Sequence, residues 1–259
     1  MIIQAKNIFR YRALLWALVV RGFKAKYKNS FLGILWSLLN PLLNVLIFSF
    51  VFTAILKIGI KDYPLYLLCA IFPWNFFNSA LTNSVVSIVE DSSFVKNVRF
   101  PLEIVPLAVS AVNFVNFLID LAVLLVFWVF LGRWPQGALW IYMPLIIFIE
   151  FILVGALSVL FAGLFALFRD FNFILNFSLR LFFYLVPVVY TMELVPRQWH
   201  PVYLLNPLAV IIDGFTGVFF FNTAPDISRL GLACFESGVI FIFCFWAFNK
   251  MRRYIPERL

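Results

Sequence analysis

The sequence predicts an all-α integral membrane protein with six transmembrane helices, an N-terminal amphipathic interface helix and short external re-entrant helices. Hydrophobic residues make up 64% of the 259 residues and charged residues 12%, whereas a soluble domain averages about 45–50% and about 25%. The apolar residues gather in six long runs, and a helix needs about 20 such residues to cross a bilayer. The Lys and Arg residues between these runs sort to one side, which is typical of cytoplasmic loops.

The N-terminal region, residues 1–29, alternates apolar and basic residues. This pattern favours a helix lying in the cytoplasmic membrane interface, with its apolar face in lipid and its basic face toward anionic headgroups. A disordered basic tail is the alternative, but the seven apolar residues from Leu14 to Val20 would not stay solvated. No secretory signal is evident, because this run is short and basic residues follow it.

The six predicted spans define a single membrane domain over residues 1–259. They are residues 31–55, 65–89, 104–131, 139–168, 171–190 and 230–249. The first five thus occupy residues 31–190, and residues 250–259 form a basic tail. Fourteen of the 20 Lys and Arg residues fall on one side of these spans and five on the other. This asymmetry predicts that both termini are cytoplasmic.

The connection at residues 191–229 is predicted to be an external gate region. Its segment 207–221 is apolar but only about 15 residues long, and crossing would place the basic tail outside. We therefore expect a re-entrant or interfacial helix there, and a second small helix near residues 197–204 between prolines. An ordinary surface loop is the alternative.

Polar side chains recur at helical spacing inside the first, second, third and fifth spans, where a lipid-facing helix has no use for them. Interhelical hydrogen bonding is an equal alternative for any single stripe, but four stripes together favour a path for a polar substrate. The third-span stripe is Ser110, Asn113, Asn116 and Asp120. The predicted path residues, with neighbouring aromatic rings, are Trp36, Ser37, Asn40, Asn44, Trp74, Asn75, Asn78, Thr82, Arg180, Tyr184 and Tyr190.

Charged and aromatic residues at membrane depth refine this prediction. An unpaired buried charge is costly, so Arg180 is expected to pair with Glu150 or Asp120, and a proton relay is the alternative use of these groups. Aromatic faces beside hydrogen-bonding side chains suit a sugar, which has apolar CH faces and a hydroxyl rim. The alternative for each ring is packing or an interfacial belt.

A charged connection between the second and third spans is predicted to contact another protein. Asp91 or Ser92 caps a short helix there, and Pro101 marks its end. A solvated turn is the alternative. The following cytoplasmic turn, between the fourth and fifth spans, is so short that it must lie close to the same surface. The predicted coupling residues of both segments are Glu90, Asp91, Ser92, Ser93, Phe94, Lys96, Asn97, Arg99, Arg169 and Asp170.

The sequence offers no catalytic residues and no metal site. His200 is the single histidine, and the three cysteines lack CxxC spacing, which favours small buried side chains. The net charge of +8 lies in the flanks of the spans and indicates membrane orientation rather than nucleic acid. No G-x-x-x-x-G-K-[ST] motif occurs, so the chain is not predicted to be an enzyme or to bind ATP in that way.

Seven short motifs resemble, in order, the permease subunits of ABC-2 type exporters, specifically the branch exporting O-antigen, capsule and teichoic-acid polysaccharides. They are residues 26–36 (KYKNSFLGILW), 39–42 (LNPL), 100–106 (FPLEIVP), 168–170 (FRD), 187–190 (PVVY), 205–208 (LNPL) and 212–215 (IDGF). The resemblance covers essentially the whole chain.

This resemblance implies a homodimeric permease in the bacterial inner membrane, moving a lipid-linked polysaccharide outward. It further implies two copies of a separate cytoplasmic ATPase, which bind ATP and Mg and dock on the connection after the second span. An exporter of a small molecule or drug is the alternative. A secondary transporter would favour an internal inverted repeat, and a membrane enzyme would need clustered acids or histidines; neither feature is evident.

Overall fold

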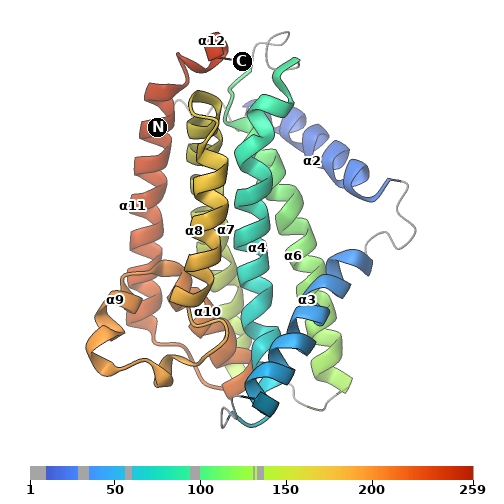
Figure 1. The fold of residues 1–259 in the computed structure, drawn as a ribbon, viewed down its shortest axis with the longest axis vertical. Coiled ribbons are helices and arrows are strands. Elements are labelled where there is room, and N and C mark those ends of the chain that lie inside the picture. The colour runs from blue at the N-terminus through green and yellow to red at the C-terminus, as the bar shows by residue number, and fades with distance from the viewer. Residues whose placement is uncertain are drawn as a thin grey trace.

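The computed structural model describes residues 10–28, 35–55, 60–93, 100–130, 132 and 137–258, which are almost entirely helical and contain no strand. Long helices stand beside one another, with shorter ones against them (Figure 1). The long helices are α4 (Tyr63–Glu90), α6 (Ile104–Phe130), α7 (Tyr142–Leu167) and α11 (Ile227–Met251). The shorter ones are α2 (Arg12–Tyr27), α3 (Leu35–Ser49), α8 (Phe171–Leu185), α9 (His200–Leu204), α10 (Pro207–Thr216) and α12 (Ile255–Arg258). The all-α class is confirmed.

Four helical segments are long and apolar enough to cross a membrane: Tyr63–Glu90, Ile104–Phe130, Leu139–Leu167 and Ile227–Met251. The helices Arg197–Leu204 and Pro207–Phe221, bent by 107° at their junction, add a fifth candidate. Leu42–Ile55 and Phe171–Leu185 are apolar but shorter. The described residues therefore contain four to five candidate spans, and the predicted number of six is not confirmed.

The predicted fifth span is shorter than expected because α8 ends at Leu185 and not at Tyr190. Val186 is extended, with φ −117° and ψ 144°, as the residue before a proline prefers. The predicted first span is helical over its described residues, because α3 continues into a π-helical segment at Phe50–Ile55; residues 31–34 lie outside the described residues.

Two tyrosines of α4 hold the non-helical segment that follows α8. The Tyr63 hydroxyl donates to the Val189 carbonyl at 2.7 Å. The Tyr66 hydroxyl lies within hydrogen-bonding distance of the carbonyls of Pro187 and Tyr190. Both rings are 1% exposed, so these bonds satisfy buried backbone acceptors that no helix serves.

The apolar segment after residue 206 is packed into the bundle. Asn206 caps α10 by accepting the Leu208 N–H at 3.1 Å, and Pro207 occupies the first turn. Most of α10 is buried, and it contacts α4, α7 and α11. An ordinary surface loop therefore does not describe this segment, and the sharp bend before it confirms the predicted break. The predicted external location stays a prediction.

Helix α2 packs along the first half of α6. Leu18 and Val19 form a buried cluster with Ile104, Ala108 and Val112. Residues 1–9 of the predicted interface helix, and residue 29, lie outside the described residues. One face of α2 thus contacts protein, and its location in the membrane interface stays a prediction.

Close packing of α7 against α11 gives the first testable prediction. A Cβ at Gly163 would lie 2.7 Å from Cδ2 of Phe248, a fully buried ring. Gly163→Ala should therefore destabilise the bundle by about 1–3 kcal/mol through overpacking, although alanine favours a helix. Gly238→Ala on α11 is the matched control, because among the described residues only its chain neighbours and the adjacent helix backbone approach the position that its methyl group would take. Thermal unfolding in detergent measures both, and an unchanged midpoint for Gly163→Ala would mean that Phe248 moves aside.

Candidate functional site

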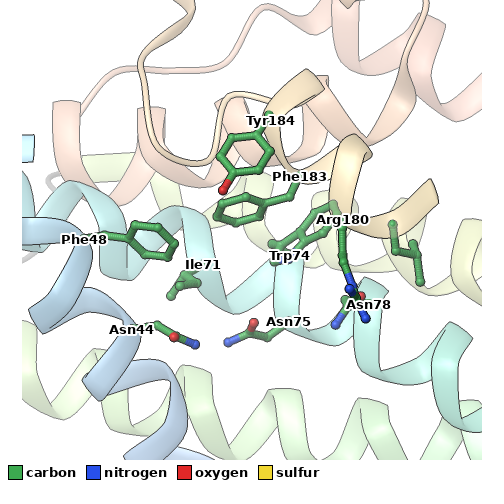
Figure 2. Close-up of a pocket in the computed structure, with 10 residues that line it drawn as sticks. Asn44, Phe48, Ile71, Trp74, Asn75, Asn78, Arg180, Phe183 and Tyr184 are labelled. Carbon is green, nitrogen blue, oxygen red and sulfur yellow. The ribbon is translucent and has the colours of Figure 1, made fainter. Parts of the chain in front are cut away.

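A groove of about 480 Å³ lies between α3, α4 and α8 (Figure 2). It combines amide, guanidinium and aromatic side chains with aliphatic ones. The lining residues are Asn44, Phe48, Ile71, Trp74, Asn75, Asn78, Leu179, Arg180, Phe183 and Tyr184. Six of the eleven predicted path residues are thereby brought together from three separate spans.

Helical spacing places the polar side chains on this groove. Asn75 and Asn78 are three residues apart on α4, and Arg180 and Tyr184 are four apart on α8, so each pair shares a helix face. Figure 2 shows Arg180 extending from α8 toward Asn78, while Asn44 of α3 and Asn75 point toward each other. The groove therefore has donors on opposite walls.

The polar side chains of the groove are not engaged in hydrogen bonds with other described residues. Asn44 and Arg180 are exposed, and Asn75 and Asn78 are half-buried. Within the described ranges, none of these four side chains makes a hydrogen bond or an ion pair. Such groups in a membrane helix face a water-filled cavity or another polypeptide rather than lipid.

The predicted ion pair of Arg180 is wrong. Glu150 of α7 is fully buried, and neither of its carboxylate oxygens has a hydrogen-bond partner among the described residues. Asp120 of α6 is also buried and does not form an ion pair with Arg180. Arg180 instead faces the groove, because its face of α8 turns toward α4.

Two residues of the third-span stripe, Ser110 and Asn113, form interhelical hydrogen bonds, which was the alternative role for each stripe. The Ser110 hydroxyl donates to the Ser158 hydroxyl of α7 at 2.7 Å. The Asn83 amide of α4 donates to the Asn113 side-chain oxygen at 3.1 Å. These bonds join α6 to α7 and α4 within the chain, and no residue of this stripe lines the groove.

The predicted aromatic residues divide by exposure. Tyr184 is 60% exposed on the groove, whereas Trp74 is 6% exposed and packs against Phe183 and other rings. Tyr190 lies outside the groove, where its hydroxyl donates to the Tyr184 carbonyl at 2.9 Å. Trp74 is therefore chiefly a packing residue, although it also borders the groove.

The remaining predicted path residues are not placed on the groove. Thr82 is half-buried on α4 and does not line it. The side chains of Trp36, Ser37 and Asn40 lie outside the described part of the structure. Sequence reasoning missed Phe48 and Phe183, which follow Asn44 and Arg180 by four and three residues; helical spacing from the polar stripes could have found them.

The predicted coupling segment begins with an ion pair. Asp91 follows α4, and the Arg21 guanidinium of α2 donates to both of its carboxylate oxygens, at 2.9 and 2.7 Å. Glu90 and Ser93 are exposed and Ser92 is half-buried. The other predicted residues of this segment lie outside the described residues: Phe94, Lys96, Asn97 and Arg99.

The turn between α7 and α8 presents its two predicted coupling residues to the surface. Arg169 and Asp170 are both exposed, and the Arg169 guanidinium carbon lies 5.3 Å from the centre of the Phe165 ring. Figure 1 places this turn at the end of the bundle that also carries α12, opposite α9. The turn and Asp91 are thus available at the same end.

A second cavity of about 480 Å³ lies near the start of α4 and was not predicted. It is lined by Ile60, Lys61, Asp62, Thr191, Glu193, Phe220 and Phe221. In the described part of the chain, no three or more His, Cys, Asp or Glu side chains are grouped so as to hold a metal ion.

Comparison with known proteins places these features in a family. The ABC-2 type transporter family matches residues 13–220. The chain is 29% identical over 232 residues to the O-antigen export system permease protein RfbA of Myxococcus xanthus, covering 89% of each chain. It is 29% identical over 247 residues to the protein of the same name from Klebsiella pneumoniae, covering 95% of each. Because the family match spans most of the chain, from α2 to α10, this protein belongs to the ABC-2 type transporter family.

Proposed function

We propose that this protein is the permease subunit of an ATP-driven ABC exporter that moves a lipid-linked polysaccharide across the bacterial inner membrane. The groove between α3, α4 and α8 carries this proposal, because it collects unbonded amides, an arginine and an exposed tyrosine on helices of a membrane protein. Hydroxyl-rich cargo needs such hydrogen-bonding groups beside aromatic faces. The relatives named O-antigen export permeases support this class of cargo.

The permease works as a homodimer in this proposal. Polar side chains exposed on the groove would meet lipid in a lone protomer, at a cost of a few kcal/mol for a charged group. A second copy related by a twofold axis encloses the two grooves in one channel. The channel then holds sugars weakly at many points, so that a long chain slides through.

Energy comes from a separate ATPase, two copies per dimer, which bind ATP and Mg. The exposed residues near Asp91 and in the turn at Arg169 and Asp170 form the docking surface. Both termini of the permease are cytoplasmic, in keeping with the sidedness of the basic residues. The bent α9–α10 region is then the external gate.

Replacing Tyr184 tests the path within this function. Tyr184→Ala should slow ATP-dependent glycan export several-fold, since a stacking contact contributes on the order of 0.5–1.5 kcal/mol. Tyr184→Phe should retain most of the rate. Export is measured as surface glycan in cells that express the permease together with its ABC ATPase.

The matched control is Leu185→Ala, an equally exposed neighbour on α8 that does not line the groove. Its export rate should equal that of the unaltered protein. Equal rates for Tyr184→Ala and Leu185→Ala would contradict the proposed path. Absence of ATP-dependent glycan export by the unaltered pair would overturn the proposed function.

A further inference from the structure

The groove carries a positive charge that a neutral sugar does not require. Arg180 is the one charged residue among its ten lining side chains, and none of the ten is acidic. No carboxylate among the described residues pairs with it. An arginine costs several kcal/mol at membrane depth unless an anion or water meets it.

Arg180 lies inside α8 and not at either of its ends. It is the tenth residue of α8, so at 1.5 Å per residue it lies roughly 14 Å from the start of that helix. The hydrocarbon core is about 30 Å thick. The guanidinium also extends toward Asn78 and the other groove amides rather than along α8 to either helix end (Figure 2).

The surrounding donors define the chemistry of a ligand. The guanidinium has five N–H donors in a planar fork that matches phosphate oxygens. Asn44, Asn75 and Asn78 each add an NH₂ group, and their side chains have no other bonds within the described ranges. Tyr184 and Trp74 line the same groove.

We propose that Arg180, with Asn75 and Asn78, forms a subsite for the phosphate of a lipid-linked glycan, while Tyr184 contacts the adjoining sugar. This assignment rests on the proposed function and deepens it. The subsite recognises the junction between lipid and glycan, which is where the cargo carries negative charge whatever its sugar sequence. The headgroup phosphate of an anionic bilayer phospholipid, in which no choline group neutralises the charge, offers the same chemistry and is the competing source.

The test measures binding to the permease–ATPase complex in nanodiscs of phosphatidylcholine. The probes are a polyprenyl diphosphate and the polyprenol of equal length. The unaltered complex should bind the diphosphate at least tenfold more tightly than the alcohol. Arg180→Gln should remove this preference by raising the Kd for the diphosphate tenfold or more, as loss of a charged hydrogen-bonding partner predicts.

Two further variants serve as controls for the effect of Arg180→Gln. Arg180→Lys keeps the charge but loses the planar fork, so its Kd should fall between those of the unaltered complex and Arg180→Gln, and it remains testable if Arg180→Gln does not assemble. Arg197→Gln removes an exposed arginine outside the groove and should leave both affinities unchanged. An unchanged diphosphate preference in both Arg180 variants would overturn the subsite.

The competing phosphate source and the proposed function are tested separately. Phosphatidylglycerol added to the nanodiscs should not weaken diphosphate binding; competition at equal lipid concentration would assign the site to phospholipid and overturn the cargo proposal. Glycan export in cells is the independent readout of function. If glycan is exported but the Arg180 variants bind the diphosphate as tightly as the unaltered complex, only the subsite is overturned. If no glycan is exported, the proposed function is overturned and the binding result still stands.

Discussion

Reversing the charge of Asp91 is expected to abolish export while leaving the permease folded and inserted. Asp91→Arg places two cations where Arg21 of α2 now donates to both carboxylate oxygens. The two side chains are 54% and 29% exposed, so the pair contributes only about 0–1 kcal/mol to stability. Loss of export would therefore reflect broken coupling between α2, the segment after α4 and the ATPase. Surface glycan and membrane-inserted protein are measured together.

A charge swap is the decisive control for this prediction. The double change Arg21→Asp with Asp91→Arg restores opposite charges and should recover a large part of the export rate. Lys24→Glu reverses another exposed charge of α2, one that makes no ion pair among the described residues, and should leave export intact. If export survives Asp91→Arg, even combined with reversal at Glu90 and Lys96, the segment is only a turn.

Truncating Tyr66 is expected to have the largest effect on stability. Its ring is 1% exposed in the main hydrophobic cluster, and Tyr66→Ala should cost about 3–5 kcal/mol, as for other large buried rings. The change also removes the hydroxyl partner of the carbonyls of Pro187 and Tyr190. Thermal unfolding and protease cleavage between α8 and α9 measure the two consequences.

The contributions of the Tyr66 hydroxyl and of its ring to stability can be measured separately. Tyr66→Phe keeps the packing but leaves buried carbonyls unsatisfied, at about 1–3 kcal/mol. Tyr203→Phe removes a half-buried hydroxyl that bonds the Tyr190 hydroxyl and should have a smaller effect. If Tyr66→Phe unfolds at the midpoint of the unaltered protein, these hydrogen bonds do not stabilise the segment after α8.

Hydrophobic length predicted the long helices well. The predicted spans 65–89 and 104–131 end within two residues of α4 and α6, because each is a continuous apolar run with polar flanks. The same criterion extended the fifth span past Leu185 to Tyr190. Length and composition do not register that a proline at 187 disfavours helix at Val186, so the boundary there was wrong.

Helical periodicity predicted which residues share one face of a helix, but not which neighbouring helix that face packs against. It placed Asn75 with Asn78 and Arg180 with Tyr184, and the structure brings both pairs to one groove. It could not tell that the Asn113 face would meet Asn83 inside the protomer. Nor could it tell that Arg180 would turn away from Glu150, because a repeat of 3.6 residues fixes the side of a helix and leaves its packing partner open.

Helix α4 is a single continuous helix that connects the two ends of this molecule. Its 28 residues span roughly 40 Å, with the Asp91 ion pair just beyond one end and the two tyrosines that hold the turn after α8 at the other. If the helix pivots as a rigid body, a displacement at Asp91 produces a displacement in the opposite direction at Tyr63 and Tyr66. Pro73 removes one backbone hydrogen bond between these two ends. The stiffness of the helix around Pro73 therefore determines how much of a displacement at one end is transmitted to the other.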